Sequence, residues 1–212
     1  MIFRDPYTDA LLEAADALMH AENAYCKGPM RTDDNDWTTA FLRRMTAHAH
    51  LNRTIKLYAH KHVSGAMDHA MVETLAMLLK AYLLAAGRSD LSVASEKTIH
   101  RKGVRPDVSV WQSGVEAPVA VIEAKVQMGW GRSNVAEGFR QREADLVAAG
   151  VPHRNIWHVV GTQSNWTRGA EIEWGSRWRV MVEGPWNGKR LHPLDPIFVT
   201  IANLPKNTQE AA

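Results

Sequence analysis

The chain has 212 residues, of which 45% are hydrophobic and 23% charged, and its formal net charge is +2. This composition is typical of a folded α/β protein and excludes a disordered chain or one dominated by a basic polymer-binding tail. The single cysteine, Cys26, excludes an internal disulfide and a zinc site built from several cysteines, and it fits a reducing, cytoplasmic setting. No signal-peptide segment follows Met1, and the apolar stretch from Ala76 to Ala86 is interrupted by Lys80, so we expect a soluble protein without a membrane partner.

Helical periodicity dominates the first part of the chain. Apolar residues recur at helical spacing in three stretches, which run from Thr8 to about Tyr25, from about Trp37 to Val63 and from about Ala66 to Ala86. Gly87 is a candidate stop for the third helix. We therefore predict an N-terminal helical region over residues 1–65 and a core that begins with the third helix.

The pattern changes to β-strands after Gly87. Strands are predicted at Leu91–Ile99, Val104–Trp111, Val119–Val126 and Asn155–Gly161, with a helix at Ser133–Ala149 before the last of them. Two further antiparallel strands are predicted at Arg177–Val182 and Ile197–Ile201. The core over residues 66–161 thus has the order α-β-β-β-α-β, which predicts an α/β fold with a mixed sheet flanked by helices. Residues 162–212 form a C-terminal β extension, and we expect one compact domain.

Two short motifs lie at the edges of apolar strands. Arg105-Pro106-Asp107 opens the second strand, and Glu123-Ala124-Lys125 closes the third. Side chains alternate along a strand, so Glu123 and Lys125 point to the same face, and a neighbouring strand can bring Asp107 to the same point. Two carboxylates bind a hard divalent cation, and an ammonium group positions water or stabilises charge. These groups are what metal-assisted hydrolysis of a phosphodiester needs.

On Pro106-Asp107, Glu123 and Lys125, the region from Ala66 to Gly161 resembles the PD-(D/E)xK nuclease superfamily, which includes most type II restriction endonucleases and several repair and recombination nucleases. Either motif alone is common and usually marks a surface turn or a strand end, but their joint occurrence in one hairpin is much rarer. The resemblance implies a restriction-endonuclease-like core, with Mg²⁺ held by Asp107 and Glu123 and a catalytic Lys125. It also implies products with 5′-phosphate and 3′-hydroxyl ends.

Three further polar residues are candidates for the same site. Glu73, in the third helix, stands where many members of the superfamily place an acid directed at the metal. Glu96, in the first strand, is a candidate metal ligand facing the same cleft. Gln141 lies in the helix after the motif, where some members place a glutamine or lysine near the scissile phosphate. The alternative for each residue is an ordinary solvent-facing position.

Candidate DNA-binding residues follow the second motif. Arg132 and Asn134 lie where a helix begins, and the free N–H groups of a helix N-terminus can bind phosphate, although a plain strand-to-helix connection has the same pattern. The Arg- and Trp-rich segment after the fourth strand contributes Gln163, Asn165, Arg168 and Arg177. Arginine, asparagine and glutamine read base edges in the major groove, but in loops they are also commonly solvated.

The sequence therefore favours a Mg²⁺-dependent type II restriction endonuclease that cuts double-stranded DNA as a homodimer, because two-fold protein symmetry matches a palindromic site. A structure-selective or nonspecific repair, recombination or defence nuclease is the nearest alternative. A DNA-binding module without catalytic activity is an alternative of another class. A hydrolase of a small phosphate ester has no supporting feature in the sequence.

Overall fold

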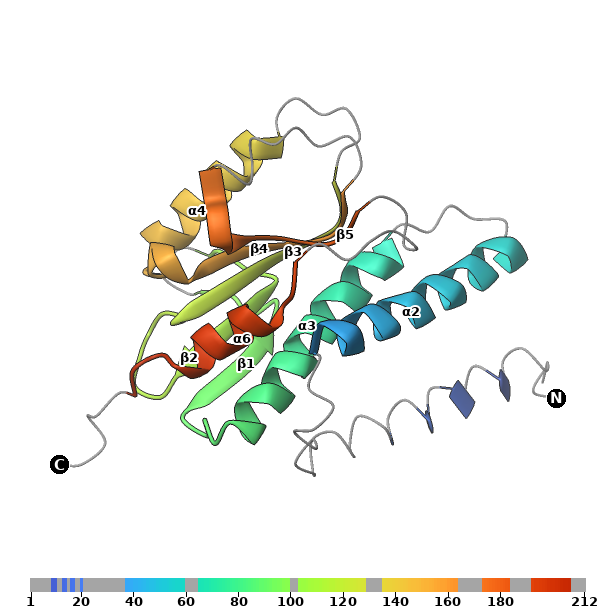
Figure 1. Cartoon of the computed structure of the whole chain (residues 1–212), viewed down its shortest axis with the longest axis horizontal. Coiled ribbons are helices and arrows are strands. Elements are labelled where there is room, and N and C mark those ends of the chain that lie inside the picture. The colour runs from blue at the N-terminus through green and yellow to red at the C-terminus, as the bar shows by residue number, and fades with distance from the viewer. Residues whose placement is uncertain are drawn as a thin grey trace. The chain divides into compact units, whose positions relative to one another are not determined.

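The structure is a computed structural model, and it describes residues 9–10, 13–14, 16–17, 20, 37–59, 65–99, 103–128, 135–163, 173–183 and 192–206 (Figure 1). The chain divides into two units, Met1–Asn35 and Asp36–Ala212. In the first unit the described residues are helical and exposed, in agreement with the helix predicted there. All the elements discussed below belong to the second unit.

The second unit is built on a five-stranded mixed sheet. Its strands are β1 (Leu91–Ser95), β2 (Val108–Gln112), β3 (Ala120–Met128), β4 (Ile156–Gln163) and β5 (Trp178–Glu183), and they are adjacent in that order. Strand β2 is antiparallel to both β1 and β3, whereas β3, β4 and β5 are mutually parallel. The predicted α/β class and mixed sheet are confirmed. The strand predicted at Arg177–Val182 is present as β5, but the prediction that it is antiparallel is wrong, because β5 pairs with β4 in parallel.

Helices flank the sheet. Helix α3 (Gly65–Ala85) packs against β1, β2 and β3, and α2 (Trp37–Ala59) packs on α3. Helix α4 (Val135–Ala148), which links the parallel strands β3 and β4, contributes Leu146 to a core cluster with Val121 and Ile156. Ser95 contacts α3, and by strand register its side chain points to the face opposite that of Val121. Helices α3 and α4 therefore cover opposite faces of the sheet, as Figure 1 shows.

Helix α3 is apolar around much of its circumference, and its position explains why. Met71, Leu75, Leu78, Leu79 and Leu83 are all buried. A helix with a narrow apolar stripe covers one neighbour, whereas a helix that is apolar on several sides lies between layers. Contacts of α3 with the sheet, α2 and α6 supply those layers.

The bounds of the first two strands differ from the prediction. Strand β1 ends at Ser95 because Glu96 has φ +48°, a left-handed conformation that an extended strand does not contain. Strand β2 begins only at Val108, after Pro106, which has no N–H to donate to a strand ladder. Gly87 has φ +68° after α3, as expected for its predicted role as a helix stop.

The strand predicted at Ile197–Ile201 is wrong, because this segment lies in helix α6 (Asp195–Ala202). Its β-branched residues favour a strand, but Asp195 and Pro196 in the first turn are helix-start residues. Ile197, Phe198 and Ile201 lie on one side of the helix and are buried, so packing decides the conformation. The ring of Phe198 lies 5.7 Å from that of Tyr82 in α3.

The start of α2 is bound by a carboxylate from α6. The N–H of Trp37 donates to Oδ1 of Asp195 at 3.2 Å, and the hydroxyl of Thr38 donates to Oδ2. The N–H of Leu194 in turn donates to the Thr38 hydroxyl at 2.8 Å. The first turn of α2 contains no acidic residue, so Asp195 supplies the negative charge that a helix N-terminus favours. Among the described helices, none is both long and apolar enough to cross a membrane.

Candidate active site

The two motifs meet where β2 and β3 separate. The strands pair from Val110 and Ala120 to Val108 and Ile122, and β3 continues beyond this last pair. The N–H of Ala124 then donates to Oδ2 of Asp107 at 2.8 Å, so a side chain takes the place of the next partner on β2. Ala124 lies between Glu123 and Lys125, and the carboxylate of Asp107 is therefore held against the centre of the second motif.

Glu123 is the most unusual carboxylate of this region. Its residue is only 4% exposed, and its Oε1 atom is buried without a hydrogen-bond partner among the described residues. Its Oε2 atom lies 3.0 Å from Nε of Arg142. Burial raises the pKa of Glu123 and the charge of Asp107 raises it further, whereas Arg142 and Lys125 act in the opposite direction. The ionised form of Glu123 is thus held at an energetic cost beside a second acid.

Lys125 completes the group from the same strand. Its residue is exposed, whereas Ala124 is buried on the other face of β3. After burial, Asp107 and Arg142, the positive charge of Lys125 also acts on Glu123, and it lowers the pKa of that carboxyl. The structure therefore brings together two acids, Asp107 and Glu123, and one exposed cationic side chain, Lys125, as the motif spacing predicts.

Arg142 in α4 is a site residue that sequence reasoning missed. Besides its contact with Glu123, its Nη2 donates to the carbonyl oxygen of Arg105, in the first motif. Sequence reasoning instead selected Gln141, whose amide lies at the surface and donates to Oδ1 of Asp145 at 2.9 Å. Helical spacing contained the relevant signal, since residue 142 shares a side of the helix with the buried Phe139 and Leu146.

Glu73 and Glu96 lie near the motifs but are not joined to the two acids. Glu73 is exposed and accepts a hydrogen bond at 2.9 Å from the hydroxyl of Ser95, which points to the face opposite Glu123. Glu96 forms a 3.9 Å ion pair with Arg105, and its N–H donates to the main-chain oxygen of Asp107 at 3.0 Å. Neither side chain has a described contact with the carboxylates of Asp107 or Glu123.

Most of the candidate DNA-binding residues cannot be placed. Arg132, Asn134, Asn165 and Arg168 lie outside the described residues, and for Gln163 only the main chain at the end of β4 is described. Arg177 has internal partners, since its guanidinium contacts the carboxylate of Glu143 and the carbonyl oxygen of Ile156.

A second buried glutamate lies on the same side of the sheet. Glu143 of α4 accepts hydrogen bonds from Arg177 and from Nε1 of Trp174 at 3.0 Å, and its carboxylate lies 3.3 Å from Nε2 of the buried His158. Burial alone would raise the pKa of Glu143, but its contacts with His158, Arg177 and Trp174 outweigh burial and lower it to about 2. Burial lowers the pKa of His158. Since His158 is the register partner of Glu123 on β4, this network supports the strand next to the motif.

The donor set of the motif suits Mg²⁺, although it is small. Within the described part of the chain, no group of three or more histidine, cysteine, aspartate or glutamate side chains is arranged to hold a metal ion. Mg²⁺ is commonly bound by one or two carboxylates together with water and phosphate oxygens. A cation beside Asp107 and Glu123 would give the unpaired Oε1 a partner and offset the repulsion that raises the pKa of Glu123. The residues present therefore fit the ion that the motif implies.

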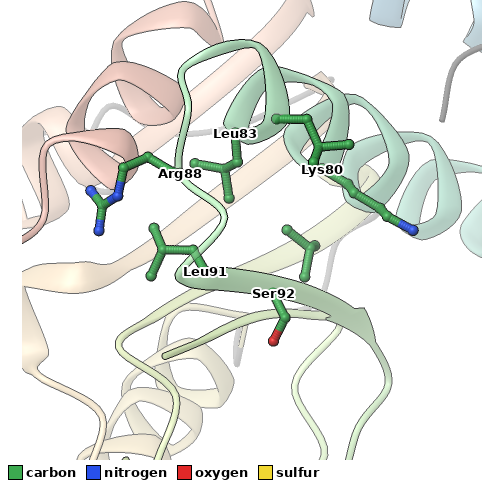
Figure 2. Close-up of a pocket in the computed structure, with 7 residues that line it drawn as sticks. Lys80, Leu83, Arg88, Leu91 and Ser92 are labelled. Atoms are coloured by element: carbon green, nitrogen blue, oxygen red, sulfur yellow. The ribbon is translucent and has the colours of Figure 1, made fainter. Parts of the chain in front are cut away.

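A pocket of about 210 Å³ lies elsewhere, between α3 and the edge strand β1. Figure 2 shows Leu83 and Leu91 lining it, with Lys80 at one side and Ser92 at another. None of its lining residues belongs to either motif. This pocket therefore lies apart from the candidate site, which is marked by its clustered charges.

Comparison of the chain with protein-family models, with curated proteins and with solved structures finds no significant match. The functional argument consequently depends on the geometry and electrostatics of the chain's own residues.

Proposed function

We propose that this protein is a Mg²⁺-dependent endonuclease of the PD-(D/E)xK type, which hydrolyses phosphodiester bonds in double-stranded DNA. The observation that carries the proposal is the hydrogen bond from Ala124 N–H to Asp107, because it joins the first acid to the centre of the Glu-x-Lys motif. Chance matches to two common motifs would not be expected to meet in space at a point where two strands diverge.

The order of elements supports the same proposal. The sequence of α3, β1, β2, β3, α4 and β4, with an antiparallel hairpin followed by a parallel crossover, is the order expected of a restriction-endonuclease-like core. The two acids lie where β2 and β3 separate, with Lys125 exposed beside them.

In this proposal, each motif residue has a separate role. Asp107 and Glu123 hold Mg²⁺, which when bound lowers the pKa of water and offsets negative charge on the phosphate. Lys125 is exposed and lies two residues beyond Glu123 on the same strand. It orients the attacking water or stabilises charge on the phosphate oxygens. The products are 5′-phosphate and 3′-hydroxyl ends. A cytoplasmic type II restriction enzyme that acts as a homodimer is the form we favour.

The test is a magnesium-dependent digest of plasmid and phage DNA, followed by sequencing of the ends. We expect discrete fragments from the wild type, and no cleavage by Asp107→Asn or Lys125→Ala. Asp68→Asn and Lys80→Ala serve as matched controls, because they remove the same charges at exposed positions outside the motifs. A smear, or a preference for branched DNA, would identify the structure-selective or nonspecific nuclease instead. DNA binding without cleavage under any condition would favour the catalytically silent module.

A further inference from the structure

The guanidinium of Arg142 touches both acid-bearing segments at once. Its Nε lies 3.0 Å from Oε2 of Glu123 in β3, and its Nη2 donates to the main-chain oxygen of Arg105, two residues before Asp107. The side chain of Arg142 is 29% exposed, so these contacts are only partly screened by solvent.

These contacts close a ring. Arg142 joins Glu123 to the segment that carries Asp107. The carboxylate of Asp107 in turn accepts a hydrogen bond from the N–H of Ala124, which lies next to Glu123 on β3. A guanidinium is planar, with five donors in fixed directions, and it can hold two acceptors at a set separation. An ammonium group at the same position would keep the charge but would lack this fixed geometry.

We propose that Arg142 is a positioning residue of the candidate site. It fixes the separation of the Asp107 and Glu123 carboxylates before a cation or DNA binds, and it leaves Oε1 of Glu123 unoccupied for a cation. This role rests on the proposed nuclease function, in which the two carboxylates share one ion. Groups that orient ligating carboxylates in this way commonly change metal affinity or activity about 10–100-fold when they are replaced.

The chain offers a close control for charge. Arg140 lies on the same helix, pairs with Glu173 at 2.5 Å and is 58% exposed. The described contacts of Arg140 do not include either motif. Replacing either arginine with glutamine removes one positive charge from α4, but only Arg142→Gln opens the ring.

The experiment compares wild type, Arg142→Gln, Arg142→Lys and Arg140→Gln. We expect Arg142→Gln to lower kcat about 10–100-fold and to raise the Mg²⁺ concentration for half-maximal rate about tenfold. The KM for DNA should change by the same factor in both glutamine variants, because both lose one charge. Arg142→Lys should recover part of kcat, and Arg140→Gln should retain it within about threefold.

A second measurement does not depend on nuclease activity. Amide hydrogen exchange at Ala124 reports the Asp107 bond directly, and we expect Arg142→Gln to lower its protection about tenfold or more while the amides of β5 keep theirs. Arg140→Gln should leave Ala124 protected. Unchanged protection and unchanged magnesium dependence in Arg142→Gln would overturn the positioning role. If the wild type neither cuts DNA nor binds Mn²⁺, the nuclease proposal fails, and exchange at Ala124 still decides whether Arg142 holds the two segments together.

Discussion

Glu123 and Glu143 are two buried glutamates between α4 and the same face of the sheet, yet their surroundings are opposite. Glu143 has hydrogen bonds from Arg177 and Trp174 and a nearby histidine, and its pKa is lowered to about 2. Glu123 has one arginine, an acid as a neighbour and an unpaired oxygen, and its pKa is raised. Both oxygens of the Glu143 carboxylate have partners within the protein, whereas Oε1 of Glu123 has none among the described residues.

The difference separates a structural role from a functional one. A carboxylate with all its partners stabilises the fold, whereas a carboxylate held in an unfavourable state is a common mark of a binding or catalytic site. On this basis Glu143 belongs to the scaffold behind β4, and Glu123 belongs to the candidate site. The following predictions test that division, from the largest expected effect to the smallest.

The largest effect should come from Glu123→Gln on activity. Removal of the negative charge should lower the initial rate of Mg²⁺-dependent DNA cleavage about 10³-fold or more, because a neutral amide is a poor ligand for Mg²⁺. The rate is measured at saturating Mg²⁺ and DNA. Glu137→Gln, which changes an exposed glutamate of α4, is the control and should keep the wild-type rate. Wild-type cleavage by Glu123→Gln would contradict the site assignment.

Glu143→Gln should act on stability instead. It leaves the partly buried guanidinium of Arg177 without its carboxylate, and breaking a buried pair in this way costs about 3–5 kcal/mol. Chemical denaturation monitored by tryptophan fluorescence measures the free energy of unfolding. The rate per folded molecule should fall far less than in Glu123→Gln. A loss of stability below about 0.5 kcal/mol would show that Glu143 is not a structural centre.

The pH dependence of stability should report the same carboxylate. The pKa of Glu143 is about 2 in the folded protein and 4.5 as its ordinary value, so the stabilisation is present above pH 4.5 and is lost as the pH falls towards 2. The difference corresponds to about 3 kcal/mol. The gap in unfolding free energy between wild type and Glu143→Gln should therefore narrow over this range. A constant gap would assign the stabilisation to packing rather than to charge.

Glu123→Gln should have a small effect of opposite sign on stability. Since the folded-state pKa of Glu123 is raised, the ionised form destabilises the fold at neutral pH, and removal of the charge should increase the unfolding free energy by an amount on the order of 1 kcal/mol. The gain should disappear at low pH, where wild-type Glu123 is protonated. Destabilisation at neutral pH would place Glu123 with Glu143 in the scaffold.

Glu73→Gln should have the smallest effect. Glu73 is exposed and bonded to Ser95 on the face away from Glu123, so we expect the cleavage rate to stay within about threefold of wild type. Titration of the rate with Mg²⁺ checks this. A loss above tenfold, with a higher Mg²⁺ requirement, would return Glu73 to the site.

The parts of the molecule that were predicted correctly depend on local patterns. The continuous apolar run Val119–Ile122 predicts β3, and the alternation of side chains along a strand places Glu123 and Lys125 on one face without any tertiary information. The strand predicted at Ile197–Ile201 failed because β-branched residues also fit a helix whose buried side faces Trp37 and Tyr82. Local preference was overridden there by packing against distant elements.

Arg142 shows a second limit. Whether residue 141 or 142 of α4 meets β3 depends on how the helix is rotated about its axis when it packs on the sheet. Phe139 and Leu146 settle that rotation through contacts with distant strands, including Val160 of β4 and Val121 of β3. Selection by distance along the chain from the motif ignores which side of α4 carries the apolar residues, and it therefore favoured the neighbouring Gln141.

The bond between Asp195 and the start of α2 has a consequence for synthesis on the ribosome. The acceptor for the Trp37 N–H is made 158 residues after its donor, so α2 must wait for almost the whole chain before its first turn is closed. Contacts of such long sequence separation slow folding, since the intervening chain must be ordered first. A nascent chain that lacks α6 would therefore hold Trp37 and Tyr82 open to solvent and to chaperones.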